Sequence, residues 1–140
     1  MTADALRSVS LTRTGPATFE AVNERGGRLT MSSAGTEDFT PVELLLAAVA
    51  GCSGVDVDAL TSRLAEPMTF RISAEAEKLR DADGNHLGPL TVTVEVTFPD
   101  GEPGDAARHR LPDAVARSRD RLCTVSRTVQ LPTPVDYRLA

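Results

Sequence analysis

A helical segment that is apolar on every side constrains this chain more than any other feature. The segment Leu44–Cys52 reads LLLAAVAGC, and a helix without a polar face is normally buried in a protein core. Three start signals precede it: Thr40 as N-cap, Pro41 at the first helical position, and Glu43 three residues after the cap. We therefore predict a long buried helix that begins near Pro41 and ends before Pro67.

The residues before this helix predict a β-meander. Apolar and polar side chains alternate along short runs, and Gly-Pro and Gly-Gly pairs separate these runs as turns. The predicted strands cover residues 7–14, 18–23 and 28–32.

Beyond the helix, alternation predicts two long strands joined through the turn-rich sequence DADGNHLG, then a second helix and two short strands. Their predicted bounds are 68–80 and 89–98 for the long strands, Pro112 to about Leu122 for the helix, and 125–131 and 135–139 for the short strands. This order of elements predicts a single α+β domain over residues 1–140.

Composition narrows the class of protein. Hydrophobic residues make up 41% and charged residues 25% of the chain, as in soluble globular proteins. A net charge of -5 argues against a general nucleic-acid binder, which needs a basic surface. The N-terminus shows no export-signal pattern, and the longest apolar run is too short to span a bilayer. We expect a cytoplasmic protein that binds neither nucleic acid nor membrane.

Two cysteines, Cys52 and Cys123, are the candidate chemical groups. In a cytoplasmic protein such a pair is more naturally two thiols, or a redox-active pair, than a structural disulfide. His86 and His109 lie at no metal-ligand spacing from them, so we expect no metal and no other cofactor. Cys52 is either a small buried hydrophobic residue or a nucleophile, and an ionised Asp56 one helical turn later would oppose its ionisation.

Several arginines surround Cys123 in the sequence. They either favour its thiolate or form a solvated basic helix face, and the sequence leaves both interpretations open. The residues are Arg108, Arg110, Arg117, Arg119, Arg121 and Arg127.

Two segments carry a resemblance to a known family. PVELLLAAVAGC (Pro41–Cys52) and RLCTVSRTV (Arg121–Val129), with the distance between them, resemble the two cysteine segments of the OsmC/Ohr family. The resemblance implies an OsmC-like fold, with an N-terminal meander, a buried central helix, further antiparallel strands and a second helix. It also implies an intertwined homodimer whose sites lie at the subunit interface.

The same resemblance implies a chemistry for the cysteine pair. Cys52 would be the peroxidatic nucleophile that attacks an organic hydroperoxide and becomes a sulfenic acid. Cys123 would resolve it as a disulfide. A lipoyl-bearing protein or another dithiol would then reduce the pair, in defence against oxidative stress.

The activating residues are less defined. The family's peroxidases carry a Glu ten residues before the peroxidatic Cys, where this chain has Val42, and Glu43 follows. Glu43 is therefore a catalytic candidate or only the acid of the helix cap. Arg13 is the nearest candidate for the family's activating Arg, with Arg25 and Arg28 as alternatives.

Two other functions remain open. The protein could bind a small apolar ligand at the dimer interface without catalysis, or it could be a scaffold with inert thiols. Contact between Cys52 and Cys123, and an Arg near Cys52, would favour the enzyme, because a disulfide needs Cα atoms within about 7 Å.

Overall fold

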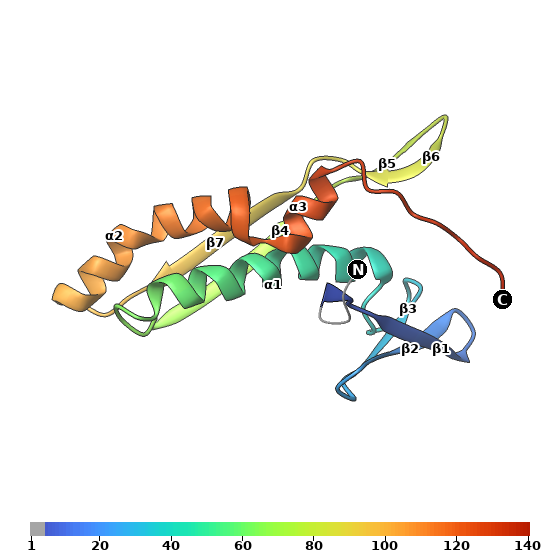
Figure 1. Ribbon diagram of the computed structural model, residues 1–140, viewed down its shortest axis with the longest axis horizontal. Helices are drawn as coiled ribbons and strands as arrows, with labels where there is room; N and C mark the ends of the chain where they lie inside the picture. The colour runs from blue at the N-terminus through green and yellow to red at the C-terminus, as the bar shows by residue number, and fades with distance from the viewer. Residues whose placement is uncertain (1–4) are drawn as a thin grey trace. The chain divides into compact units, whose positions relative to one another are not determined.

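The computed structural model describes residues 5–140 (Figure 1). The chain forms two compact units, of which the first ends at Leu45 and the second begins at Leu46. In the first unit, β1 (Val9–Gly15), β2 (Thr18–Asn23) and β3 (Arg28–Ser32) form an antiparallel sheet in the order β1-β2-β3. The predicted meander is confirmed. That one domain covers both units stays a prediction.

Helix α1 (Pro41–Thr61) begins where the sequence predicts. Thr40 donates its backbone N–H to Glu43 Oε1 at 2.9 Å, and Glu43 donates its N–H to Thr40 Oγ1 at 3.2 Å. This reciprocal capping box satisfies two N–H groups that have no partner within the helix. The helix ends at Thr61, several residues before Pro67, and a short turn follows.

Helix α1 is buried along one side only. Val49, Ala50 and Val57 are buried, whereas Leu45 and Val55 are 39% and 72% exposed. By length and composition alone α1 could cross a membrane, a test that the core helix of a soluble protein also passes. Only 22% of its most apolar stretch is buried within the described chain. Much of its apolar surface is therefore uncovered in a single chain.

The second unit contains an antiparallel ribbon of β4 (Thr69–Glu75) and β7 (Thr91–Thr97). Side chains such as Ile72 and Val94 are half-buried, while the alternating polar ones are exposed, as expected for a ribbon with one covered face. Helix α1 approaches the covered face closely: a Cβ added to Gly54 would lie 3.6 Å from Ile72 Cγ2.

The two predicted long strands are each shorter than the sequence suggests. A separate hairpin, β5 (Lys78–Asp81) and β6 (Gly84–Leu87), interrupts the ribbon. Asp81 Oδ1 closes its turn by accepting the N–H groups of Asp83 and Gly84 at 2.8 and 3.1 Å. Gly84 has φ 130°, a conformation that glycine adopts without strain.

The predicted start of the second helix at Pro112 is wrong. Helix α2 covers Glu102–Arg117 and contains Pro112 in its interior. Small residues such as Gly104, Ala107 and Ala114 form its buried side, and their weak hydrophobicity concealed the helical pattern. Pro112 is exposed, so its missing N–H falls on the solvent side.

The predicted C-terminal strands are also wrong. A π-helical turn, η2 (Ser118–Leu122), follows α2, and residues predicted as a strand form helix α3 (Thr124–Gln130). Side-chain hydrogen bonds within the segment favour the helix, because Gln130 Nε2 donates to the Ser126 carbonyl at 3.1 Å. Residues 131–140 are extended, exposed and unpaired with any strand of the described chain.

Candidate functional site: a thiol pair at the start of α3

The second unit brings the two cysteines together. Cys52 lies within α1 and is half-buried, and Cys123 lies between η2 and α3 and is 1% exposed. Both are free thiols, and the side chain of Cys123 is close enough to Cys52 to raise its pKa. Two residues distant in the sequence are thus brought together, as attack of one sulfur on the other requires.

The first turn of α3 acts on both cysteines. Cys123 is the N-cap of this helix, and its Sγ accepts the N–H of Ser126 at 3.2 Å. The backbone amide of Val125 acts on Cys52 and lowers its pKa. Unpaired N–H groups at a helix start favour a sulfur that carries negative charge. These backbone donors leave no sequence signal, and sequence reasoning missed them.

Burial raises the pKa of Cys52 above its ordinary value, and the side chain of Cys123 raises it further. The Val125 amide opposes this by lowering the pKa, while the charges of Cys123 and Asp56 raise it. Within this unit, Cys52 is therefore mainly a neutral thiol at neutral pH. A thiol protein that works at neutral pH needs a further group to favour the thiolate.

Asp56 lies one turn after Cys52 and is tied to the segment that carries Cys123. Ser118, 1% exposed, donates its hydroxyl to Asp56 Oδ2 at 2.8 Å. The carbonyl of Ser118 accepts the N–H of Cys123 at 2.9 Å, which closes the π-helical turn. The sequence indicated Asp56 from its spacing, but nothing in it indicated Ser118.

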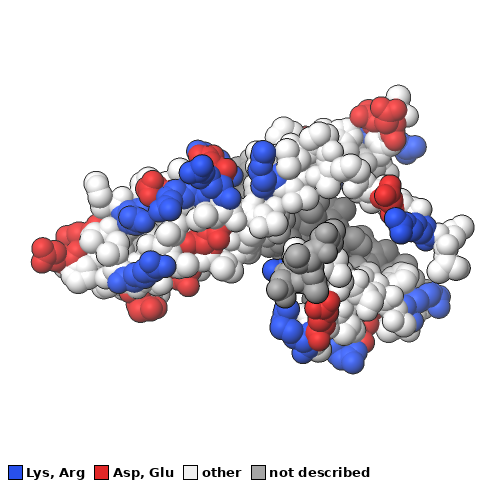
Figure 2. Space-filling model, in the orientation of Figure 1, with Lys and Arg blue, Asp and Glu red and all other residues white. Residues whose placement is uncertain are grey.

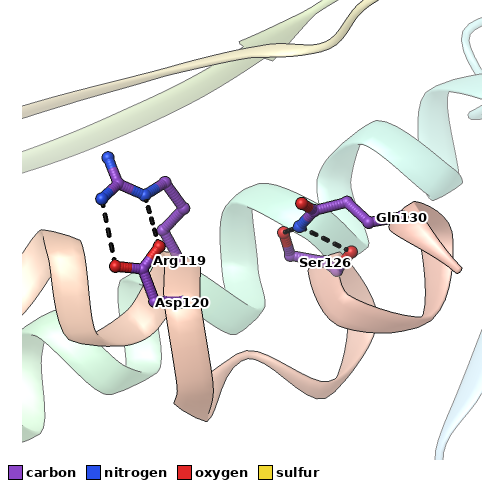
Figure 3. A network of polar contacts seen from close by, with 4 residues as sticks. All are labelled: Arg119, Asp120, Ser126 and Gln130. Carbon is purple, nitrogen blue, oxygen red and sulfur yellow. Dashed lines mark hydrogen bonds and ion pairs between the residues drawn. The ribbon is translucent and has the colours of Figure 1, made fainter.

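Most arginines of α2 and η2 are exposed to solvent. Arg108 pairs with Asp105 at 2.6 Å, and Arg119 binds both oxygens of Asp120 at 2.8 and 3.1 Å (Figure 3). Basic and acidic side chains are interspersed at the α2 end of the visible surface (Figure 2). Of the arginines in residues 46–140, none is among the groups that shift the pKa of Cys52. That these arginines favour the thiolate of Cys123 stays a prediction.

The other predicted site residues lie in the first unit. Arg13 is exposed on β1, Arg25 lies in the turn after β2, and Arg28 pairs with Glu20. Glu43 belongs to the capping box, and hydrogen bonds from Thr40 lower its pKa. The capping role is thus observed, and the catalytic roles of Arg13 and Glu43 stay predictions.

A cavity of about 440 Å³ lies among α1, β7, α2, η2 and α3. Its wall is largely aliphatic, with valines from each element except η2, and its polar lining includes Arg119, Ser126 and Gln130. Ser53, beside Cys52 in the chain, also lines it. In Figure 3 the Arg119–Asp120 and Ser126–Gln130 contacts lie on two successive helical segments, η2 and α3. The volume suits a small organic molecule.

Within residues 5–140, no group of three or more His, Cys, Asp and Glu side chains is arranged to hold a metal ion. The site itself offers two neighbouring thiols, a carboxylate and backbone amides.

Comparison of the backbone with solved structures shows the same fold in several proteins. A hypothetical protein from Aquifex aeolicus is 22% identical, with a TM-score of 0.71 over 89% of this chain and 87% of that one. An OsmC-like protein of unknown function from Vibrio cholerae is 11% identical, with a TM-score of 0.72 over 90% and 94%. The organic hydroperoxide resistance protein OhrB of Bacillus subtilis is 19% identical, with a TM-score of 0.56 over 90% and 93%.

Because all three sequence identities are low, these likenesses establish the fold alone. No curated protein sequence matches the chain. The model of the family of OsmC-like proteins matches residues 34–138, which include α1, both cysteines and all of the second unit up to the last two residues. The chain belongs to the OsmC-like protein family.

Proposed function

We propose that the protein is a thiol-dependent peroxidase that reduces organic hydroperoxides, ROOH + 2 e⁻ + 2 H⁺ giving ROH and H₂O. The observation that carries the proposal is that the fold brings the free thiols of Cys52 and Cys123 close enough for Cys123 to act on the pKa of Cys52. Inert thiols need no such proximity. A structural relative, OhrB, is named as an organic hydroperoxide resistance protein, which agrees with this chemistry.

The half-buried Cys52 is the peroxidatic residue. Its thiolate attacks the outer oxygen of the hydroperoxide, the O–O bond breaks, and the alcohol leaves after it takes up a proton. The buried Cys123 then attacks the sulfenic acid, and water leaves as the disulfide forms. A lipoyl-bearing protein or another dithiol returns both cysteines to thiols.

Activation of Cys52 requires a group beyond its own unit, because burial and Asp56 raise its pKa. We assign this role to Arg13, with Arg25 and Arg28 as alternatives, and propose that Glu43 orients the guanidinium. The amide of Val125 adds a fixed donor to the thiolate. A cation within about 4–6 Å lowers a thiol pKa by favouring the charged form.

The exposed side of α1 supports a homodimer. Leu45, Ala48, Gly51 and Val55 are exposed along one side of the helix, and nothing lies within 4 Å of a Cβ added to Gly51. Members of the OsmC/Ohr family are commonly homodimers. We propose that a second copy covers this side in an intertwined dimer, and that the protein works in the cytoplasm.

The decisive experiment counts free thiols before and after one equivalent of cumene hydroperoxide. The wild type should lose both thiols and gain one intramolecular disulfide. Cys52→Ser should consume no hydroperoxide, and Cys123→Ser should react once and retain added oxygen on Cys52. If the wild type keeps two free thiols under excess hydroperoxide, the peroxidase proposal fails.

The cavity beside α3 favours a second candidate, a binding protein for a small apolar molecule. Its aliphatic wall needs no thiol chemistry to hold a ligand. In that case a hydrophobic fluorescent probe should bind equally to the wild type and to Cys52→Ser, and both proteins should leave cumene hydroperoxide unconsumed.

A further inference from the structure

Asp56 is a half-buried carboxylate that the proposed peroxidase cycle does not use. Across residues 5–140, no Lys, Arg or His forms an ion pair with it, and its hydrogen-bond donor is the hydroxyl of Ser118. A partly buried charge without a cation is unfavourable. Asp56 also opposes the thiolate of Cys52. A carboxylate that opposes the first reaction step calls for another role.

Ser118 connects this carboxylate to the second cysteine. Its hydroxyl binds Asp56 at 2.8 Å, and its carbonyl accepts the N–H of Cys123 at 2.9 Å. The latter bond closes the π-helical turn, a rare structure that is frequent at functional sites. Asp56 on α1 and Cys123 on the adjacent segment are therefore held by one buried residue.

Closure of the disulfide needs a base near these groups. Cys123 is 1% exposed, so its proton has little access to bulk water. The two histidines are exposed and lie elsewhere: His86 on β6 contacts Asp81 at 3.5 Å, and His109 lies on α2. In residues 46–140, Asp56 is the only charged side chain other than a cysteine whose charge acts on Cys52.

We propose that Asp56 is the proton acceptor for closure of the Cys52–Cys123 disulfide and that Ser118 is its positioning residue. This inference rests on the proposed function. The Cys123 thiol gives its proton to the Asp56 carboxylate, and its sulfur attacks the sulfur of the Cys52 sulfenic acid. The S–O bond breaks, the S–S bond forms, and the departing hydroxide takes the proton from Asp56 to leave as water.

The Asp56→Asn variant should change the two steps in opposite directions. Loss of the negative charge favours the Cys52 thiolate, so oxidation of Cys52 should become several-fold faster at neutral pH. Loss of the proton acceptor should slow disulfide closure by roughly 10-fold or more. A purely structural role would not speed the first step while it slows the second.

The two steps are measured separately. Oxidation is timed with cumene hydroperoxide in a Cys123→Ser background, by mass spectrometry of dimedone-trapped Cys52. Closure is timed in proteins with both cysteines, after a short pulse of hydrogen peroxide forms the sulfenic acid. Asp58→Asn, an exposed acid on the same helix, is the matched control and should leave both rates unchanged.

Ser118→Ala provides an independent test that retains the charge of Asp56. Its oxidation rate should stay within about two-fold of wild type, because the carboxylate remains, while closure slows as the carboxylate loses its position. Closure at the wild-type rate in both Asp56→Asn and Ser118→Ala would overturn the proposal. Two free thiols in the oxidised wild type would instead defeat the proposed function itself.

Discussion

At the scale of single residues, the environment of Cys52 contains opposing effects on one thiol. Burial and the neighbouring Cys123 raise its pKa, and the amide of Val125 lowers it. Because the thiolate is the reactive form, a raised pKa means slower reaction at neutral pH and faster reaction as the pH increases.

We therefore expect Cys123→Ala to lower the pKa of Cys52, because it removes the side chain and the charge of Cys123 that raise it. The rate at which iodoacetamide alkylates Cys52 is measured from pH 6 to 10, a range that brackets the ordinary thiol pKa of about 8.5. In Cys123→Ala this rate should begin to rise at a lower pH than in the wild type. Ser53→Ala, next to Cys52, is the control and should leave the profile unchanged. An unshifted profile in Cys123→Ala would contradict the effect of Cys123 on Cys52.

Glu43 has an observed role in the helix cap and a proposed role in catalysis. Substitution of its capping partner Thr40 distinguishes the two roles. Thr40→Ala removes one bond of the capping box and should cost about 1 kcal/mol of stability without loss of peroxidase activity. Glu43→Gln should leave stability closer to wild type, since an amide oxygen can still accept the Thr40 N–H. If Glu43 also orients an activating Arg, only Glu43→Gln loses activity. Urea denaturation and hydroperoxide consumption measure the two effects.

The capping carboxylate also predicts a pH dependence. Hydrogen bonds from Thr40 lower the pKa of Glu43, so the folded state favours its charged form. The resulting stabilisation is present above the pKa of the unfolded state and is lost as the pH falls through the lower folded pKa. Wild type should lose more stability than Glu43→Gln when urea denaturation is repeated across this acidic range.

At the scale of elements, α2 contains a residue that ordinary helices exclude. Pro112 lies in its interior and lacks the N–H that would bond to the carbonyl one turn earlier. We expect Pro112→Ala to raise the stability by about 1–3 kcal/mol. Pro103→Ala is the control, because a proline in the first turn breaks no helical hydrogen bond. Equal melting temperatures for Pro112→Ala and wild type would argue against the helical start at Glu102.

Close packing against the backbone of Pro99 leaves no room for a side chain at Gly104, near the start of α2. A Cβ on Gly104 would lie 1.7 Å from the carbonyl oxygen of Pro99, and backbone cannot yield as a flexible side chain can. Gly104→Ala should therefore lower the melting temperature strongly. Gly51→Ala, a helical glycine with open space around it in the single chain, is the comparison for the added methyl group itself.

At the scale of the whole molecule, the uncovered side of α1 calls for a partner. Val55 is 72% exposed in the single chain and lies on the same side of α1 as the exposed Leu45 and Ala48. Val55→Glu should shift a homodimer towards monomer in analytical ultracentrifugation. Ser73→Glu places the same charge on the exposed face of the ribbon and should leave the dimer intact. If the wild type sediments as a monomer at micromolar concentration, the proposal that a second copy covers α1 is contradicted.

Several features of the molecule follow from sequence because they depend on neighbours in the chain. The capping box at Thr40 and Glu43 forms as predicted, since all its atoms lie within one helical turn. The strands β2 and β3 have the predicted bounds, because alternation and glycine turns are local signals. The segments around Cys52 and Cys123 likewise indicated the OsmC-like family, which the family match over residues 34–138 confirms.

Tertiary structure decided the features that depend on residues distant in sequence. The segment after Cys123 alternates like a strand but forms α3, where the cysteine sulfur and the Ser126–Gln130 contacts replace strand pairing. The amide of Val125 and the hydroxyl of Ser118 act on Cys52 and Asp56 only because α1 packs beside η2 and α3. Local propensity sets which elements can form, whereas the reactivity of a thiol depends on burial, charge and donors supplied by the rest of the fold.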